Sequence, residues 1–442
     1  MRKKWISILL LSMIMIASTL VGCGMATHVG VEPINDGKSI KREGEILAVG
    51  ELDRAYIEGL NGFAYDIFDQ LLSGDNVFIS PYSISLALSM LYNGADQETR
   101  AEMAEMLGFD RLTNYTSEYD KEANDYMNAN ARYLMNSLHE ADSEVTLKLA
   151  NSIWSSKDAN FSETIDTALL SPVRQYYNAD IFQVDFREDQ TLKDVNKWVS
   201  NHTDGMIDPF LEKFQDKDNL KLFLANAIYF NGKWTNPFQK DRTRKHQFYG
   251  TDGLQTVDMM FMYEENYRYY SENGLRGVEL PYGDERMVMN IIIPEDTVNS
   301  SIGEICDTLK AEDITRFLSQ LDKASKIELG TLALPKFEME YGTVNLNNAL
   351  QELGMIDAFS ESSADFNLIG DNLYLGTVSH MAKIQVEEWG TKAAAATGLE
   401  VTKTSMPLDP PIDFIVDVPF LYFIRDKDTG TILFIGIMNN IA

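Results

Sequence analysis

The chain has 442 residues, with 67 acidic against 38 basic side chains and a formal net charge of −29 at pH 7. This excess of carboxylates argues against a nucleic-acid-binding protein, because recognition of the phosphate backbone needs clustered Lys and Arg. Hydrophobic residues make up 45% of the chain and aromatic residues 11%, which is typical of globular proteins and excludes a disordered acidic chain.

The first 22 residues have the order of a secretory signal peptide. Basic residues at positions 2–4 precede an apolar run at 6–20, which is shorter than a membrane-spanning helix usually needs. Residues 20–23 (LVGC) resemble a bacterial lipobox, whose cysteine, here Cys23, becomes the lipidated first residue of the mature chain. Plain cleavage near Gly22 and an uncleaved anchor are the alternatives. Lipidation predicts a chain anchored in a lipid membrane by its N-terminal acyl groups, on the extracellular face of the cell membrane, or released from it.

The segment that follows mixes Gly, Pro, Asp, Lys and Glu without periodicity as far as about residue 49. This composition predicts a flexible tether. The expected organisation is therefore a signal peptide at 1–22, the lipidated cysteine and tether at 23–51, and one folded domain at 52–442.

The folded domain opens with helical patterns. Apolar residues at helical spacing predict a helix over 56–72, with Gly74 as its C-cap. The next predicted elements are a strand at 76–79, a helix that Ser80 caps and that runs from Pro81 to near Gly94, and a helix at 98–107 that stops at Gly108.

Strand patterns dominate the later part of the chain. Alternating residues predict a strand at 145–149, and the apolar run at 222–230 is typical of a central strand. Further strands are predicted at 287–293, 327–337, 420–424 and 432–438, with turns at Asn273-Gly274 and Thr429-Gly430. Helices first and strands later, without regular alternation, indicate an α+β fold rather than a doubly wound sheet.

Motifs of enzyme chemistry are missing from the sequence. It contains no Gly-x-Ser-x-Gly elbow, phosphate-binding Gly-x-x-x-x-Gly-Lys, His-Glu-x-x-His or Gly-x-Gly-x-x-Gly. The five histidines are scattered singly, and two cysteines suit neither a disulfide scaffold nor a multi-cysteine zinc module. Cys306 reads as a small core residue. We therefore expect no cofactor, no metal and no enzymatic activity.

The segment 384–414 contains an alanine run that does not read as a helix. Four alanines are too few to nucleate a stable helix alone, and Thr and Gly close the run on both sides. With a period of two, one set of side chains, from Thr391 to Val401, is small or apolar throughout, and both charged residues, Lys392 and Glu400, fall on the other set. This pattern predicts a latent strand that can slip between two existing strands with one face toward a core.

Four segments together resemble the serpin family, over about residues 52–438. They are 76–84 (NVFISPYSI), 224–234 (LANAIYFNGKW), 388–397 (EWGTKAAAAT) and 417–424 (DVPFLYFI). The resemblance implies three β-sheets, eight or nine helices and an exposed reactive-centre loop that serves as bait for a protease. With the lipobox, the chain resembles a bacterial, lipoprotein-type member.

The mechanism that this resemblance implies is suicide inhibition of a serine protease. The protease attacks the loop and forms an acyl-enzyme, and the N-terminal part of the loop then inserts into the large sheet as an extra strand and traps the complex. The expected partner is the target protease in a covalent complex, and the inhibitor itself is expected to be a monomer.

Site residues follow from the resemblance position by position. The hinge of the loop comprises Glu388, Gly390, Thr391, Ala393, Ala394, Ala395, Ala396 and Thr397. A polar shutter beneath the opening strands comprises Ser80, Ser83, Asn226 and His380. An ion pair at the top of the sheet, the breach, joins Lys336 to Glu388, and Trp234 packs beside it.

The family's usual spacing, fifteen residues from Gly390 inclusive, predicts that the scissile bond is Thr404-Ser405. An uncharged β-branched residue before the bond suits an elastase-like or subtilisin-like protease. Lys403, which suits trypsin-like enzymes, and Met406, which suits chymotrypsin-like or elastase-like enzymes, are the alternatives.

Two other functions remain open. A non-inhibitory serpin that acts as a surface binding protein would usually have a charged or bulky hinge, which the small residues at 391–397 contradict. A solute-binding lipoprotein or hydrolase is suggested only by the lipobox and the acidic charge.

Overall fold

The computed structural model describes residues 33–34, 47–112, 114–297, 301–306, 310–391 and 411–441. Within these residues the chain forms nine α-helices. They are α1 (Arg54–Leu71), α2 (Pro81–Tyr92), α3 (Gln97–Leu107), α4 (Lys121–His139), α5 (Ser171–Tyr177), α6 (Asp189–His202), α7 (Ile302–Cys306), α8 (Ala311–Lys323) and α9 (Asn347–Glu352).

The strands of the described part form two large sheets and one short pair. A six-stranded sheet has the order β11-β13-β14-β5-β2-β4, and its members are β2 (Val145–Ser156), β4 (Asp180–Val184), β5 (Leu222–Lys233), β11 (Phe337–Asn345), β13 (Leu375–Glu387) and β14 (Gly390–Thr391). The other large sheet has nine strands: β1 (Val77–Ile79), β6 (Arg244–Gly250), β7 (Gly253–Glu272), β8 (Leu275–Pro281), β9 (Met287–Pro294), β10 (Lys326–Pro335), β15 (Ile412–Ile415), β16 (Phe420–Asp426) and β17 (Ile432–Met438). Strands β3 (Asn160–Phe161) and β12 (Gly370–Asp371) pair with each other.

The long strand β7 belongs to two groups of strands. Its first part pairs with β6 and β10, and its last five residues pair with β8, which leads on to β9, β16, β17 and β1. With the six-stranded sheet, these two groups make the three principal sheets that the family resemblance implied. The α+β prediction and the expected eight or nine helices are confirmed.

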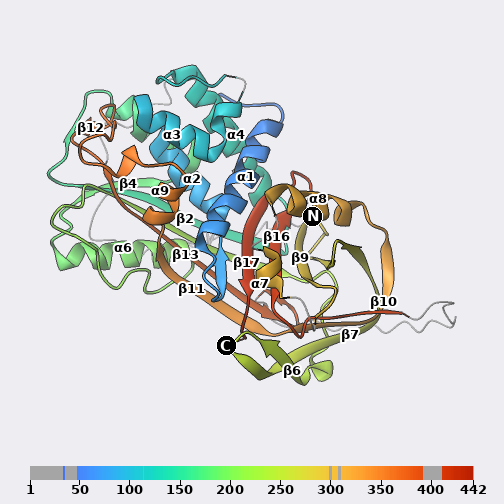
Figure 1. The fold of residues 1–442 in the computed structure, drawn as a ribbon. Helices are drawn as coiled ribbons and strands as arrows, with labels where there is room; N and C mark the ends of the chain where they lie inside the picture. Colours follow the sequence, from blue (N-terminus) through green and yellow to red (C-terminus); the bar gives the residue numbers. More distant parts are fainter. Residues whose placement is uncertain are drawn as a thin grey trace, which may run out of the picture.

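The six-stranded sheet has helices on both faces. Helices α1 to α4 lie on one side of it and α6 lies on the other (Figure 1). The larger core fills the first side and continues between the sheets, and a second core, which includes Trp154, Phe182, Trp198 and Phe223, lies between the sheet and α6. Among the described residues, none of the helices combines the length and the apolar composition that crossing a bilayer requires.

Local signals place several elements where the sequence predicts them. The Ser80 side chain accepts a hydrogen bond from the Ser83 N–H and caps α2, which begins at Pro81. Gly108, in the left-handed region at φ 73°, ends α3. The prediction that Gly74 caps the first helix is wrong: α1 ends at Leu71, and Gly74, at φ 85°, lies in the turn beyond it.

The single strand predicted over 327–337 is also wrong, because the chain changes sheets there. β10 ends at Pro335 and pairs with β7, whereas Phe337 begins β11 and pairs with Val386 of the six-stranded sheet. Lys336 stands between the two strands, and its N–H donates to Asp258 O at 2.8 Å. Its side chain therefore projects at the junction of the two sheets.

Candidate functional site

The end of the seam between β5 and β13 is where the chain enters the predicted loop. The two strands pair in parallel from Leu375 opposite Leu222 to Lys383 opposite Tyr229. Beyond this ladder the short strand β14 lies between them and pairs antiparallel to both. After β13, the chain thus turns back at 388–389 and enters the sheet at Gly390 and Thr391.

No residue other than glycine fits at position 390. Its φ of +140° is unfavourable for other residues, and a Cβ atom would overlap the carbonyl oxygen of Gly232 on β5. The backbone of β14 therefore approaches β5 closely enough to extend its ladder.

Thr391 is fully buried between the two strands. Its hydroxyl lies 3.0 Å from the hydroxyl of Tyr282, whose ring stacks on Trp234 with centroids 4.4 Å apart. Trp234 in turn donates its indole N–H to Glu387 O at 3.0 Å and its backbone N–H to Trp389 O at 3.0 Å. These bonds hold the turn at 388–389 against the end of β5. Burial also raises the pKa of Tyr282, so that its hydroxyl stays protonated.

Glu388 and Lys336 form an ion pair at the same end of the sheet. The Lys336 ammonium lies 3.0 Å from Glu388 Oε2 and 3.7 Å from a carboxylate oxygen of Glu387. The Thr243 hydroxyl donates to Glu388 Oε1 at 2.8 Å. Burial opposes ionisation of Glu388, but these partners lower its pKa below the ordinary value. The pair is therefore ionised at neutral pH and ties β14 to the junction of the two sheets.

A second polar cluster lies under the middle of the seam, at the start of α2. Asn226 Nδ2 donates to Ser83 O at 2.9 Å and to Ser83 Oγ at 2.6 Å, and also to the side chain of Asn151. The ring of His380 connects Asn226 Oδ1, through Nδ1, to the Ser80 N–H, which donates to Nε2 at 3.1 Å. His380 and Asn226 are also partners in the ladder between β13 and β5. Separation of these two strands must therefore break this cluster.

We expect His380 to make stability depend on pH. Burial lowers the pKa of His380 from 6.5 to about 3, because the ring is fully enclosed. Below pH 6.5 this histidine binds a proton in the unfolded chain, whereas in the folded chain it stays neutral down to about pH 3. The contribution of neutral His380 to the free energy of unfolding is therefore complete above pH 6.5 and falls as the pH drops. The loss is about 2 kcal/mol between pH 6.5 and pH 5. Urea unfolding at both pH values, in wild type and His380→Gln, checks this: equal pH dependence in the two proteins would contradict it.

The remaining predicted site residues lie outside the described residues. These are Cys23, the hinge residues Ala393, Ala394, Ala395, Ala396 and Thr397, and the candidate reactive-bond residues Lys403, Thr404, Ser405 and Met406. In contrast, every predicted shutter and breach residue is described. Hydrogen bonds link Ser80, Ser83, Asn226 and His380 in a chain, Lys336 pairs with Glu388, and Trp234 bonds to the backbone on either side of Glu388.

Three residues of the site were missed by the sequence reasoning. Tyr282, Thr243 and Asn151 each contact a predicted residue, but none lies in a segment that carries the resemblance. Alternation in β2 was a weak signal for Asn151, and no local signal marks Tyr282 or Thr243. No group of three or more His, Cys, Asp or Glu side chains within the described ranges could hold a metal ion.

Comparison with known proteins gives one consistent result. The family model described as Serpin (serine protease inhibitor) matches residues 58–441. An uncharacterized serpin-like protein of Thermococcus kodakarensis is 32% identical over 403 residues, covering 90% of this chain and 88% of the relative. Human leukocyte elastase inhibitor is 32% identical over 385 residues, covering 85% of this chain and 96% of the relative.

Comparison with solved structures indicates the same family. The crystal structure of the thermophilic serpin tengpin in its native state matches with a TM-score of 0.77 and 30% identity, over 89% of this chain and 96% of that one. Serpins are generally protease inhibitors and not enzymes. The chain belongs to the serpin family.

Proposed function

We propose that the chain is a suicide inhibitor of serine proteases that traps the acyl-enzyme by inserting its reactive-centre loop between β5 and β13. The observation that carries this proposal is β14, in which Gly390 and Thr391 already pair with both strands. The rest of the seam is closed by direct pairing of β13 with β5. The sheet thus holds the first residues of an added strand and has room for more only if these two strands separate.

Insertion of the loop would release enough free energy to keep the protease trapped. About ten new ladder hydrogen bonds, each contributing about 1 kcal/mol net, rival the whole stability of a typical domain. The burial of Thr391 fits the set of small and apolar side chains that continues to Val401 in the sequence. Insertion along this register would bury no charge on the core side. A native state that can release this much free energy on loop insertion is not the most stable state, and it persists because a kinetic barrier separates it from the inserted state.

The proposed target is an elastase-like or subtilisin-like protease, cleaving at Thr404-Ser405. An uncharged β-branched residue before the bond supports this class. A relative named leukocyte elastase inhibitor, at 32% identity, agrees with it. The proposal includes secretion, lipidation of Cys23 and attachment to the extracellular face of the cell membrane, which the leader residues 1–23 support. The tether would then present a monomeric inhibitor to proteases outside the cell.

The test is to incubate the chain lacking residues 1–23 with pancreatic elastase, subtilisin, chymotrypsin and trypsin. We expect an adduct with elastase or subtilisin that survives boiling in SDS, because an ester to the trapped protease is covalent. Mass spectrometry should find a released C-terminal peptide that begins at Ser405; a start at Thr404 or at residue 407 would instead assign the bond to Lys403 or Met406.

Other outcomes separate the alternatives. Cleavage within the loop without any adduct would favour a non-inhibitory serpin that acts as a surface binding protein. An adduct that is lost when the active-site serine of the protease is first blocked would confirm that the ester, and not simple adhesion, joins the two chains.

A further inference from the structure

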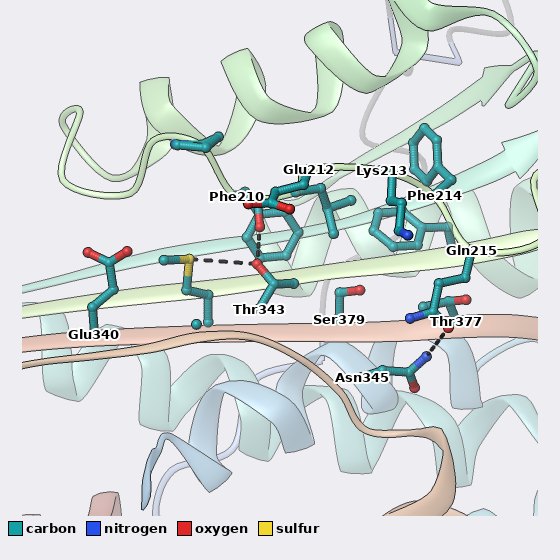
Figure 2. A pocket seen from close by; sticks show the side chains of 15 residues that line it. Phe210, Glu212, Lys213, Phe214, Gln215, Glu340, Thr343, Asn345, Thr377 and Ser379 are labelled. Atoms are coloured by element: carbon teal, nitrogen blue, oxygen red, sulfur yellow. Dashed lines mark hydrogen bonds between the residues drawn. The ribbon is translucent and has the colours of Figure 1, made fainter. Parts of the chain in front are cut away.

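The second core is interrupted by a pocket of about 430 Å³ on the α6 side of the six-stranded sheet. The segment 209–215, which follows α6, forms its roof, and strands β5, β11 and β13 form its floor (Figure 2). Asn196 of α6 holds this roof in place: its side chain accepts from the N–H groups of Phe210 and Leu211, at 3.1 and 2.7 Å, and donates to Leu211 O at 2.7 Å. The pocket is thus preformed, and its volume is in the range of small-molecule sites.

The hydroxyl groups of two largely buried residues, Thr377 and Ser379, face this pocket. Alternation along β13 turns Thr377 and Ser379 toward the pocket and His380 toward the core below the sheet. The exposed fractions of Thr377 and Ser379 are only 8% and 3%. In the described part of the chain no protein atom hydrogen-bonds to either hydroxyl, both hydroxyl oxygens stay open to solvent, and Figure 2 shows Ser379 projecting from the sheet toward the roof. Hydroxyls that face a pocket without a protein partner are open to bond to a ligand or to water.

The half-buried ring of Phe214 gives the pocket one aromatic wall, and the charged residues at the rim favour neither sign of charge. Phe214 and Phe223 meet edge to face with centroids 5.4 Å apart. The rim carries one exposed acid, Glu212, and one exposed base, Lys213, while Glu340 is paired with Lys383 at 2.9 Å. An uncharged aromatic group therefore suits the walls better than an ion does.

We infer that this pocket binds a small uncharged molecule that has an aromatic body and a hydrogen-bonding head group. The ring packs against Phe214, and the head group bonds to the hydroxyls of Ser379 and Thr377. An amide is suitable, because it supplies both a donor and an acceptor to two hydroxyls that can serve as either.

The position of the pocket couples its ligand to the sheet. Phe223 of β5 and Thr377 of β13 both line the pocket and are direct partners across the seam. Separation of the two strands pulls the floor apart, so the ligand binds the closed sheet in preference and stabilises it by mass action. Because loop insertion needs that separation, the ligand slows the trapping step; this consequence alone rests on the proposed function.

Binding is tested by titrating the full chain with N-acetyl-L-phenylalaninamide, an uncharged amide with one aromatic ring, and following the ligand signals by NMR. A ligand of this size in such a pocket should reach a Kd of about 1 mM or lower. The double variant Thr377→Val/Ser379→Ala should weaken binding at least about fivefold. The matched control Ser362→Ala, which removes an exposed hydroxyl elsewhere, should bind as wild type does.

A variant with a large side chain at the pocket tests whether the probe binds there. Gly342 lines the pocket on β11, and a Cβ atom there meets nothing within 4 Å. Gly342→Trp should abolish binding, and Gly342→Ala should preserve it. Absence of saturable binding to wild type, or wild-type affinity in Gly342→Trp, would overturn the inference.

Coupling is tested by hydrogen exchange, which does not depend on inhibition. At ten times its Kd, the probe should slow exchange of the amides in 222–229 and 375–383 about tenfold wherever exchange requires the seam to open. Gly342→Trp should show no change. Unchanged exchange in saturated wild type would overturn the coupling, and failure to form a protease adduct would count against the proposed function without altering this result.

Discussion

Thr391→Arg is expected to convert the chain from an inhibitor of its target protease into a substrate. Thr391 is fully buried in β14, against the Tyr282 hydroxyl and between the ladders of β5 and β13. A guanidinium in that space would be a charge buried against the Tyr282 hydroxyl, at a cost of several kcal/mol. The longer, charged side chain would therefore hold β14 out of the sheet and slow insertion, while the loop sequence that the protease reads remains unchanged.

The measurement for this variant is the ratio of boil-stable adduct to cleaved inhibitor. Since about 1.4 kcal/mol corresponds to a factor of ten in rate, the number of inhibitor molecules consumed for each protease trapped should rise at least about tenfold. Thr391→Val is the matched control, because it keeps the shape and apolar character of the side chain and loses only the bond to Tyr282. If Thr391→Arg traps protease with the stoichiometry of wild type, insertion does not begin at β14.

Asn226→Leu is expected to cause the largest loss of stability among single changes at the site. The substitution keeps the branched shape and the number of side-chain heavy atoms but removes the donors to Ser83 and Asn151 and the acceptor for His380 in the cluster below the seam. The Ser83 hydroxyl and the His380 ring, both fully buried, each lose a hydrogen-bond partner, and each such loss costs about 1 to 3 kcal/mol. The free energy of unfolding should fall by about 3 kcal/mol, and the midpoint of thermal unfolding by about 5 °C or more.

Calorimetry of Asn226→Leu beside Asn231→Leu tests this expectation. Asn231 lies on the same strand but is only half-buried, so its substitution should change stability by less than about 1 kcal/mol. Equal midpoints for Asn226→Leu and wild type would show that the cluster contributes nothing to the closed sheet.

Several elements of the fold were predictable because their causes are local. Ser80 and Pro81 begin α2 through a cap and a preset backbone angle, and the apolar run at 222–230 marks a strand that is buried on both faces. The alternation of side chains that starts at Thr391 is also a local pattern. It predicted a latent strand, and the structure pairs its first residue between β5 and β13.

The break at Lys336 was not predictable in this way. Residues on both sides of it are extended, and Pro335, directly before it, still pairs within β10, so the local pattern does not separate one strand from two strands in different sheets. Which partner each half selects depends on β7 and β13, which lie far away in the sequence.

The sequence by itself thus determined the fold class, the positions of helices α1 to α3 and of several strands and, through a family resemblance, the residues proposed for the shutter and the breach; helices α4 to α9 were not predicted. Only the tertiary structure decided how the site residues meet: Ser80 contacts His380 across 300 positions, Thr391 contacts Tyr282 across 109, and the segment after α6 closes a pocket over β13. The physical reason is that caps and periodicity act within a few residues, whereas these contacts follow from strand pairing and packing between distant segments, which no single stretch of sequence encodes.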